Sequence, residues 1–433
     1  MKYFGTDGIR GIPNKLLTVE FTSKVGMSLS ILNNKNVYIA TDTRISKDMI
    51  KAAIISGILS MGMNAINVGI LPTPALIYYS KLKQATGIII TASHNPYYDN
   101  GIKIVNKGNK LTNEEELKIE SFIDNQIINK ELIGIYKKQD IKLFYYNYLS
   151  KYLTKINLKI VIDCANGSTY KTAPYIFNKI TNKLLVLSNN PNGININNNC
   201  GSLYPQLLIN TIKSLDYDIG FSFDGDGDRL LVVNNNGEII DGDKILYLLA
   251  LYLKSKNKLN NNTVVLSIMS NIGIINKLKE NKINVIEANV GDKNIIEILN
   301  KNNLSLGGEN SGHIIIPEIL PTGDGLLTAL LLIKIIEETN INLNTYFNNI
   351  NYYPNKLINI KTNKNIINNI ELISQINLIK NTLNNDCKII VRPSGTEDLV
   401  RLLVMAKTKE LVDKYSLELL NIISEINEES KWK

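Results

Sequence analysis

The sequence predicts an α/β fold of several domains, followed by a differently built α+β domain. The chain has 433 residues, which is too many for one ordinary hydrophobic core. Short runs rich in β-branched residues alternate with helical patterns, so residues 36–41 (NVYIAT) predict a strand and residues 46–62 predict a helix. Strand–helix alternation of this kind is typical of layered domains with parallel or mixed sheets.

The alternation continues through three blocks, and a fourth block differs from them. Further strands are predicted at residues 64–69 and 86–91, and the second and third blocks begin at residues 158–168 and 263–269. In the fourth block a helix, a strand, a loop, a strand and a long helix follow one another, which predicts an α+β domain. Lysine- and asparagine-rich stretches between the blocks are candidate linkers. We therefore expect domains at residues 1–154, 155–256, 257–364 and 365–433.

The composition excludes several classes of protein. With 44% hydrophobic and 20% charged residues it is that of a globular chain. The net charge of +8 would suit a nucleic-acid-binding protein, but the lysines are scattered, so we expect no nucleic-acid partner. Three widely spaced cysteines favour a reducing compartment, the cytoplasm, and the two histidines offer no zinc spacing. We expect no membrane partner and no signal peptide, because no apolar stretch is long enough for a span.

The most specific motif is FDGDGDR, in which Asp224, Asp226 and Asp228 alternate with glycines after a predicted strand. In an extended segment alternate side chains face the same way, so the three carboxylates converge. Their repulsion requires a hard cation between them, and a set of oxygen ligands alone favours Mg²⁺. An EF-hand loop is excluded, because Arg229 and Asn235 stand where it needs Gly and Glu. A plain acidic turn is the alternative, but it does not explain the regular spacing.

The motif TASHNP places Ser93 and His94 at the end of a predicted strand, where the ligand sites of α/β sheets gather. Serine is a weak nucleophile unless a base, a cation or a metal ion activates it. The alternative is a turn that merely ends the strand. A serine hydrolase has no support, because the chain contains no G-x-S-x-G. Lys103, in NGIKI, follows within ten residues and is a candidate for the same site, although a surface lysine is the alternative.

The motif GGENSGH holds the second histidine, His313, together with Glu309 and Ser311. Two glycines allow the backbone to approach a ligand closely, and the polar side chains suit sugar hydroxyls or an amine. A glycine-rich turn with a packed histidine is the alternative. The nearby TGDG, which includes Asp324, predicts a helix N-cap.

The motif RPSGTED offers a guanidinium, two hydroxyls and glycine-exposed amides within a few residues. Such a group forms a good phosphate-binding nest, although a bare turn between strands is the alternative. A nucleotide site has no support, because neither a Walker A motif nor a G-x-G-x-x-G is present.

Together and in this order, the motifs TASHNP, DGDGDR, GGENSGH and RPSGTE resemble the α-D-phosphohexomutase superfamily over nearly the whole chain. The opening FGTDGIRG is most similar to the bacterial branch that interconverts glucosamine 6-phosphate and glucosamine 1-phosphate for cell-wall precursors. The resemblance implies three related mixed α/β domains plus a C-terminal α+β domain around a central cleft. Activity on glucose or mannose phosphates, or an inactive phosphosugar-binding protein, is the alternative.

The resemblance implies a role for each matching residue. Ser93 would carry the phosphoryl group as phosphoserine, and one Mg²⁺ would be held by Ser93, Asp224, Asp226 and Asp228. Lys103 would serve proton transfer, Arg10 would stabilise charge and His94 would orient the serine loop. The residues expected to bind the sugar phosphate are Arg229, Glu309, Ser311, His313, Arg392, Ser394, Gly395 and Thr396.

The resemblance also implies small-molecule partners. These are the phosphosugar substrate and a hexosamine 1,6-bisphosphate as activator. It leaves the oligomeric state open, with a homodimer as one possibility. The sequence departs from the branch at Lys293, which replaces the arginine of the usual V-G-D-R, and at Asn310, which replaces a glutamine.

Overall fold

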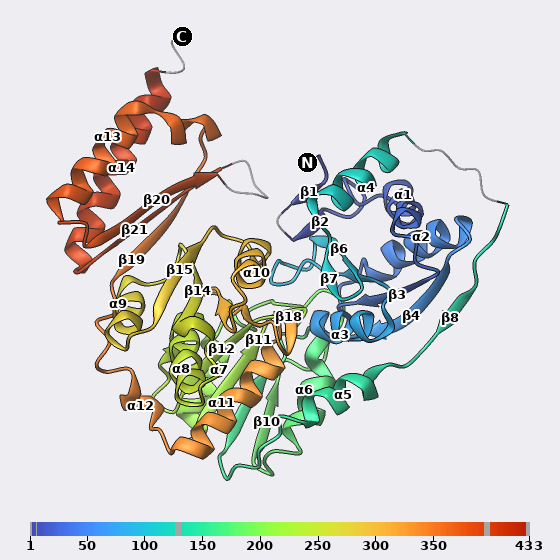
Figure 1. Cartoon of the computed structure of the whole chain (residues 1–433), viewed down its shortest axis with the longest axis horizontal. Coiled ribbons are helices and arrows are strands. Elements are labelled where there is room, and N and C mark those ends of the chain that lie inside the picture. The colour runs from blue at the N-terminus through green and yellow to red at the C-terminus, as the bar shows by residue number, and fades with distance from the viewer. Residues whose placement is uncertain (1, 6, 126–130, 394–398, 430–433) are drawn as a thin grey trace. The chain divides into compact units, whose positions relative to one another are not determined.

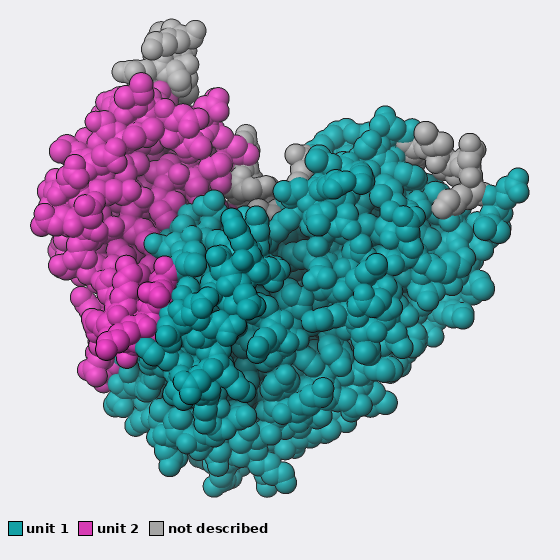
Figure 2. All heavy atoms as spheres, viewed as in Figure 1, with its two compact units in different colours: residues 1–268, 286–347 teal, residues 269–285, 348–433 magenta. Residues whose placement is uncertain are grey.

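The computed structural model describes residues 2–5, 7–125, 131–393 and 399–429. The chain divides into two compact units, shown in Figure 2. The first unit comprises residues 1–268 and 286–347, and the second comprises residues 269–285 and 348–433.

The N-terminal sheet positions two of the predicted catalytic residues. Its order is β1-β2-β6-β5-β3-β4-β8, and β7 pairs with β6 (Figure 1). Strands β3, β4, β5 and β8 run parallel, whereas β6 is antiparallel to β5 and places Lys103 opposite Ile89. The strands are β1 (Phe4–Gly5), β2 (Gly8–Gly11), β3 (Asn36–Thr41), β4 (Asn64–Ile70), β5 (Thr86–Ile90), β6 (Asn100–Asn106), β7 (Asn109–Lys110) and β8 (Tyr136–Lys138). The helices are α1 (Val19–Ser28), η1 (Leu29–Leu32), α2 (Lys47–Ser60), α3 (Thr73–Lys83), α4 (Asn113–Asn125) and α5 (Lys142–Ser150).

Strand β5 shows why the sequence forms this sheet. All five of its residues, TGIII, are buried, as expected for a central strand covered on both faces. The apolar run stops at Thr91, and the chain turns there into the loop that contains Ser93.

The second sheet, of order β10-β9-β11-β12-β13, carries the aspartate motif. Strand β11 is fully buried and pairs antiparallel with β12, and residues 224–229 form the loop between them. The strands are β9 (Ile160–Asp163), β10 (Leu184–Leu187), β11 (Ile219–Phe223), β12 (Leu230–Asn234) and β13 (Ile239–Ile240). The helices are η2 (Ser168–Tyr170), α6 (Thr172–Phe177) and α7 (Gln206–Leu215).

The third sheet, of order β15-β14-β16-β17-β18, carries the GGENSGH motif between β16 and β17. Its strands are β14 (Thr263–Ser267), β15 (Asn284–Ala288), β16 (Gly307–Gly308), β17 (Ile314–Ile316) and β18 (Leu320–Gly323). The helices of this region are α8 (Gly242–Ser255), η3 (Asn260–Asn262), α10 (Asp292–Lys301), α11 (Gly325–Thr339) and α12 (Leu343–Tyr346). Within the described residues no helix is both long and apolar enough to cross a membrane.

The second unit contains a three-stranded antiparallel sheet of order β19-β21-β20. Arg392 lies near the end of β20, whereas the predicted phosphate contacts Ser394, Gly395 and Thr396 lie outside the described residues. The elements of this unit are α9 (Ile272–Glu280), β19 (Asn355–Ile360), η4 (Lys364–Asn368), α13 (Ile370–Thr382), β20 (Cys387–Pro393), β21 (Val400–Ala406) and α14 (Lys409–Glu429). The predicted fold class, three mixed α/β domains and a C-terminal α+β domain, is confirmed, and the exact domain boundaries stay predictions.

The predicted N-cap at Asp324 is present at the start of α11. Its Oδ1 accepts hydrogen bonds from the amide of Leu327 (3.0 Å) and from the hydroxyl of Tyr145 (2.9 Å). Its Oδ2 is buried and has no hydrogen-bond partner among the described residues. Burial therefore raises the pKa of Asp324 to about 7.

We predict that Asp324→Asn flattens the pH dependence of stability. The folded pKa exceeds the ordinary value of 3.8, so the folded state binds this proton more tightly and stability falls as the pH rises from about 4 to about 7. Asn keeps the cap but cannot ionise. Between pH 5 and pH 8, the free energy of unfolding obtained from thermal unfolding should fall by on the order of 1–4 kcal/mol more in the wild type than in the variant. If the curves of stability against pH were parallel for the two proteins, the raised pKa of Asp324 would be contradicted.

Candidate active site

The serine loop holds Ser93 in a left-handed backbone conformation, with φ of 52°. The residue is buried, and its Oγ donates a hydrogen bond of 2.5 Å to Oδ2 of Asp224. Its amide donates to Oγ1 of Thr91 (2.9 Å), which holds the turn. Because a non-glycine residue adopts this conformation at a cost, the surrounding contacts must enforce it. The hydroxyl is thereby aimed at the aspartate loop.

Arg44 makes many of the contacts that hold the serine loop in this conformation. This residue was not identified from the sequence. The side chain is fully buried and its Nε pairs with Oδ2 of Asp42 at 2.8 Å. Its Nη2 donates to the carbonyl oxygens of Ser93 (2.9 Å) and Asn95 (2.8 Å), and its Nη1 donates to that of Pro96. The planar guanidinium suits such a set of acceptors. The only signal in the sequence was TDTR, a charged pair directly after a buried strand.

The second sheet contributes a further support for the same loop. Nδ2 of Asn197 donates to the carbonyl oxygens of Ser93 (2.9 Å) and Asn95 (3.0 Å). The serine loop is thus held both by its own domain and by the domain that carries the aspartates.

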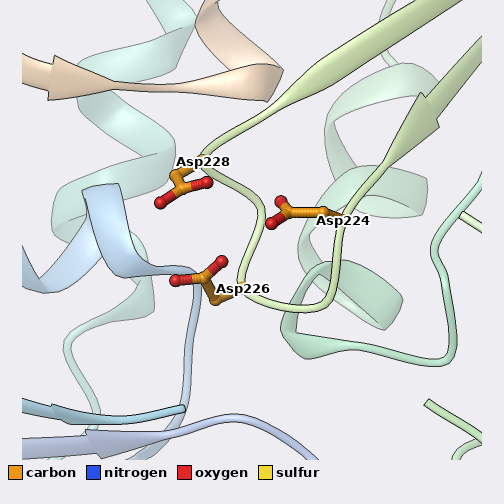
Figure 3. A group of neighbouring side chains, drawn as sticks. All are labelled: Asp224, Asp226 and Asp228. Atoms are coloured by element: carbon orange, nitrogen blue, oxygen red, sulfur yellow. The ribbon is translucent and has the colours of Figure 1, made fainter. Parts of the chain in front are cut away.

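The three aspartates converge as the sequence predicted. In Figure 3 the carboxylates of Asp224, Asp226 and Asp228 point toward one another from one loop. One oxygen from each lies within 4.8 Å of the others, and all three residues are buried. Gly225 permits the close approach to the serine loop, because a Cβ there would lie 2.5 Å from the carbonyl oxygen of Ser93.

The donor set fits a hard cation. Oδ1 of Asp226 and Oδ1 of Asp228 are buried and, in the part of the chain that the structure describes, accept no hydrogen bond. Burying carboxylate oxygens without donors is costly unless a cation or a proton compensates. Oxygen ligands of this kind suit a hard divalent cation such as Mg²⁺.

Lys103 neutralises part of this charge. Its Nζ lies 2.8 Å from Oδ2 of Asp226, 3.1 Å from Oδ2 of Asp228 and 2.9 Å from Oδ2 of Asp7. Burial opposes the charged ammonium, but the three carboxylates outweigh it and raise the pKa of Lys103. Burial likewise opposes ionisation of Asp228, yet Lys103 and His313 hold its pKa well below the usual range.

Among the residues that the structure describes, no cation lies as close to Asp224 as Lys103 lies to Asp226 and Asp228. Burial, followed by the negative charges of Asp228 and Asp226, raises its pKa well above the ordinary range. Its Oδ2 accepts from Ser93, and its Oδ1 accepts from the amide of Arg229 (3.2 Å). A divalent ion among the three carboxylates would remove this penalty.

His94 lies beside the serine but is a poor base. Its Nδ1 is 3.4 Å from Oγ of Ser93. The positive charge of Arg229, then burial, then Arg10 lower its pKa to about 2. A group with so low a pKa accepts protons weakly at neutral pH. The expected role of His94 in orienting the loop stays a prediction.

The loop of the GGENSGH motif, here called the sugar loop after its expected role, is held by contacts of the Glu309 side chain. Oε1 of Glu309 accepts from the amide of Gly291 (3.1 Å), and Oγ of Ser311 lies 3.4 Å from Oε2 of Glu309. Glu309 is 9% exposed, so the carboxylate is nearly enclosed.

His313 contacts the aspartate loop. Its Nδ1 lies 3.6 Å from Oδ1 of Asp228, and its Nε2 accepts from the amide of Gly323 (3.0 Å). Burial lowers the pKa of His313, but Asp228 and Asp292 outweigh it and raise it to about 9. Its Nε2 also lies 3.4 Å from Oδ2 of Asp292, so both ring nitrogens face carboxylates. His313 therefore packs against the loop that carries Asp228.

The two arginines of the motifs lie at the edge of this cluster. Nη2 of Arg10 pairs with Oδ2 of Asp7 at 2.8 Å, and Nε of Arg229 lies 4.0 Å from Oδ1 of Asp228. Both side chains keep a little exposure, 17% and 19%. Arg392 lies in the other compact unit.

We predict that Arg44→Lys lowers the turnover number about 100-fold, because a lysine cannot hold the same carbonyl oxygens and the serine would be misplaced. The control is Lys35→Met, which removes a bond to the carbonyl oxygen of Gly62 (2.7 Å) just before β3 and β4, at the other end of β3 from Arg44. The control should keep its activity and melting temperature. Equal activity of both variants would contradict the role of Arg44.

We predict that Asp226→Asn abolishes Mg²⁺ binding, because it removes one of three convergent charges. Isothermal titration calorimetry of the EDTA-treated protein should detect one ion per chain in the wild type and none in the variant. The control is Asp216→Asn, an aspartate with a side chain that is 96% exposed, which should bind like the wild type. Unchanged binding by Asp226→Asn would place the metal elsewhere.

The chain matches known proteins over its full length. The models of phosphoglucomutase/phosphomannomutase match in four parts: alpha/beta/alpha domain I at residues 1–129, domain II at 141–237, domain III at 241–353 and the C-terminal domain at 357–422. The phosphoglucosamine mutase of Finegoldia magna is 41% identical over 445 residues, with 98% of each chain covered. The phosphoglucosamine mutase of Fusobacterium nucleatum is 41% identical over 446 residues with the same coverage.

The fold has a close structural counterpart. A solved phosphoglucomutase/phosphomannomutase family protein of Burkholderia thailandensis superposes with a TM-score of 0.83 at 22% identity, and 98% of this chain and 97% of that chain are covered. The resemblance stated from the four motifs is therefore confirmed. The chain belongs to the phosphoglucomutase/phosphomannomutase family.

Proposed function

We propose that this chain is an isomerase that interconverts glucosamine 6-phosphate and glucosamine 1-phosphate by way of phosphoserine at Ser93. The observation that carries the proposal is the hydrogen bond from the buried Ser93 to Asp224, one of three convergent aspartates. Relatives at 41% identity over 98% of the chain carry the name phosphoglucosamine mutase, which supports the amino sugar as substrate. The reaction would supply amino-sugar phosphate for cell-wall precursors.

One Mg²⁺ per chain would be held by Asp224, Asp226, Asp228 and an oxygen on Ser93. When bound, the ion would neutralise charge on the phosphoryl group as it leaves serine. The buried and unpartnered oxygens described above support this assignment.

In the first half-reaction, the sugar's 1-hydroxyl oxygen would attack the phosphorus of phosphoserine. The bond to Oγ of Ser93 breaks as the new P–O bond forms, so the product is a sugar 1,6-bisphosphate. Lys103 would serve proton transfer once a bound cation offsets the carboxylates that raise its pKa, and Arg10 would stabilise the developing charge; both side chains pair with Asp7 at the edge of the aspartate cluster. His94 would orient the serine loop.

In the second half-reaction, the bisphosphate would turn end over end and return its 6-phosphoryl group to Ser93. A hexosamine 1,6-bisphosphate added as activator would reload a discharged enzyme in the same way. Exclusion of water is required throughout, because hydrolysis would discharge the serine.

The sugar would be read by Glu309 and Ser311, with the carboxylate of Glu309 facing the 2-ammonium. Arg229 and His313 would also line this sugar-binding site. The second phosphate would bind in the nest of Arg392, Ser394, Gly395 and Thr396, as the motif RPSGTE suggests. The partners that we expect at this site are therefore small phosphosugars only.

We further propose a cytoplasmic location, because all three cysteines, Cys164, Cys200 and Cys387, are free thiols, which suits a reducing compartment. A homodimer is our working hypothesis for the assembly, with neither nucleic acid nor membrane as a partner.

A coupled assay tests the function. Purified protein with Mg²⁺ and a trace of hexose 1,6-bisphosphate should prefer glucosamine 6-phosphate to glucose and mannose phosphates, and Ser93→Ala should be inactive. Preference for glucose or mannose phosphates would favour a phosphoglucomutase or phosphomannomutase and overturn the proposed substrate. No turnover by freshly phosphorylated protein would favour a phosphosugar-binding protein instead.

A further inference from the structure

A chain of ion pairs joins the catalytic lysine to the sugar loop. From β7, Nζ of Lys110 lies 2.9 Å from Oδ1 of Asp7 and 2.5 Å from Oδ2 of Asp292. Asp7 extends this chain of ion pairs, because its Oδ2 also pairs with Nζ of Lys103 (2.9 Å) and with Nη2 of Arg10 (2.8 Å). Charges alternate along the whole path from Asp292 through Lys110 and Asp7 to Lys103.

The other end of the path reaches the sugar loop through the backbone. Asp292 is the first residue of α10 and follows Gly291, which adopts φ of 113°. The amide of Gly291 donates to Oε1 of Glu309 (3.1 Å). A shift of Asp292 would therefore move the donor that holds Glu309.

We propose that Lys110 is a positioning residue, which acts with Asp7 and Asp292 to hold Lys103 and Arg10 at a set distance from Glu309. Asp7 and Asp292 belong to the motifs FGTDGIRG and VGDK, whose acidic residues have no part in the proposed chemistry. The inference rests on the proposed function, since it concerns residues of that site.

The surroundings argue for support and not for substrate contact. The side chains of Lys110, Asp7 and Asp292 are 19%, 21% and 9% exposed. Together with Lys103 and Asp228 they line a cavity of about 30 Å³, which is too small to hold a sugar phosphate, since ligand pockets usually have roughly 300 Å³ or more. The cavity has room for about two water molecules. Removal of Lys110 would leave two enclosed carboxylates without their shared cation.

A neighbouring ion pair provides a matched control. Nζ of Lys293, also on α10, lies 2.8 Å from Oε2 of Glu116 on α4 and donates to Oδ1 of Asn113 (2.7 Å). It joins the same two regions of the chain as Lys110 does. Within the described ranges it forms no ion pair or hydrogen bond with Asp7, Lys103 or Glu309, so its loss should weaken the structure without misplacing the site.

The test compares Lys110→Met, Lys110→Arg and Lys293→Met in the full chain. Lys110→Met should lower kcat about 10- to 100-fold with a smaller change in KM, since the displaced groups act in the transition state. Lys110→Arg can still bridge two carboxylates and should recover most of the loss. Lys293→Met should keep kcat within about threefold, while its melting temperature falls about as far as that of Lys110→Met, because each variant loses a partly buried ammonium group that bridges two side chains.

A double-mutant cycle separates positioning from simple stability. Asp292→Asn, which is nearly isosteric, should lower kcat like Lys110→Met, and the double variant should lose no more than either single variant. Additive losses, or equal losses of kcat in Lys110→Met and Lys293→Met, would overturn the proposal. The comparison uses whichever sugar phosphate the wild type turns over best. If the amino-sugar assignment is wrong, the substrate preference of the wild type will show it. If the positioning role is wrong, only the comparison of kcat among the variants will show it.

Discussion

The repulsion among three buried carboxylates is the constraint on which the rest of the site depends. Two like charges 4.8 Å apart repel by roughly 3–4 kcal/mol even at an effective dielectric constant near 20, and one carboxylate oxygen from each of Asp224, Asp226 and Asp228 lies within this distance of the others. Lys103 compensates one side of the cluster, and Asp224 on the other side is left with a raised pKa. Apolar residues would serve stability better at these positions. The cluster is therefore explained by the ion and the phosphoryl group that we propose it binds.

The fold brings the carboxylates and the serine together because buried strands from two sheets end next to each other. Strands β5 and β11 are covered on all sides, and their following loops bring Ser93 within 2.5 Å of Asp224 across the boundary between two sheets. The loops themselves are irregular, so they need supports from elsewhere. Arg44 binds the carbonyl oxygens of one loop, and His313 lies against the other. A site built in this way is preorganised, because each reacting group is held by partners that do not react.

The sequence predicted the chemistry of this site better than its supports. The metal loop was predictable because alternate aspartates in an extended loop must converge, whatever the tertiary structure. The fold class was predictable from periodicity, since buried strands such as TGIII have no polar face. The contacts of Arg44, Asn197 and Lys110 were not, because each joins segments far apart in the chain, and only the charged pair in TDTR pointed to Arg44. For the same reason the contact of His313 with Asp228 was not foreseen within a motif that otherwise suits a sugar.

The most direct test of this account is the position of a divalent ion. A crystal of the protein grown with Mn²⁺ in place of Mg²⁺ should show one anomalous peak among the carboxylate oxygens of Asp224, Asp226 and Asp228, next to Ser93. Such a peak would establish that the cluster is a metal site and that the serine belongs to it. If Lys103 alone occupied the cluster and no peak appeared there, the carboxylates would be a structural ion-pair network, and the proposed phosphoryl chemistry would lose its basis.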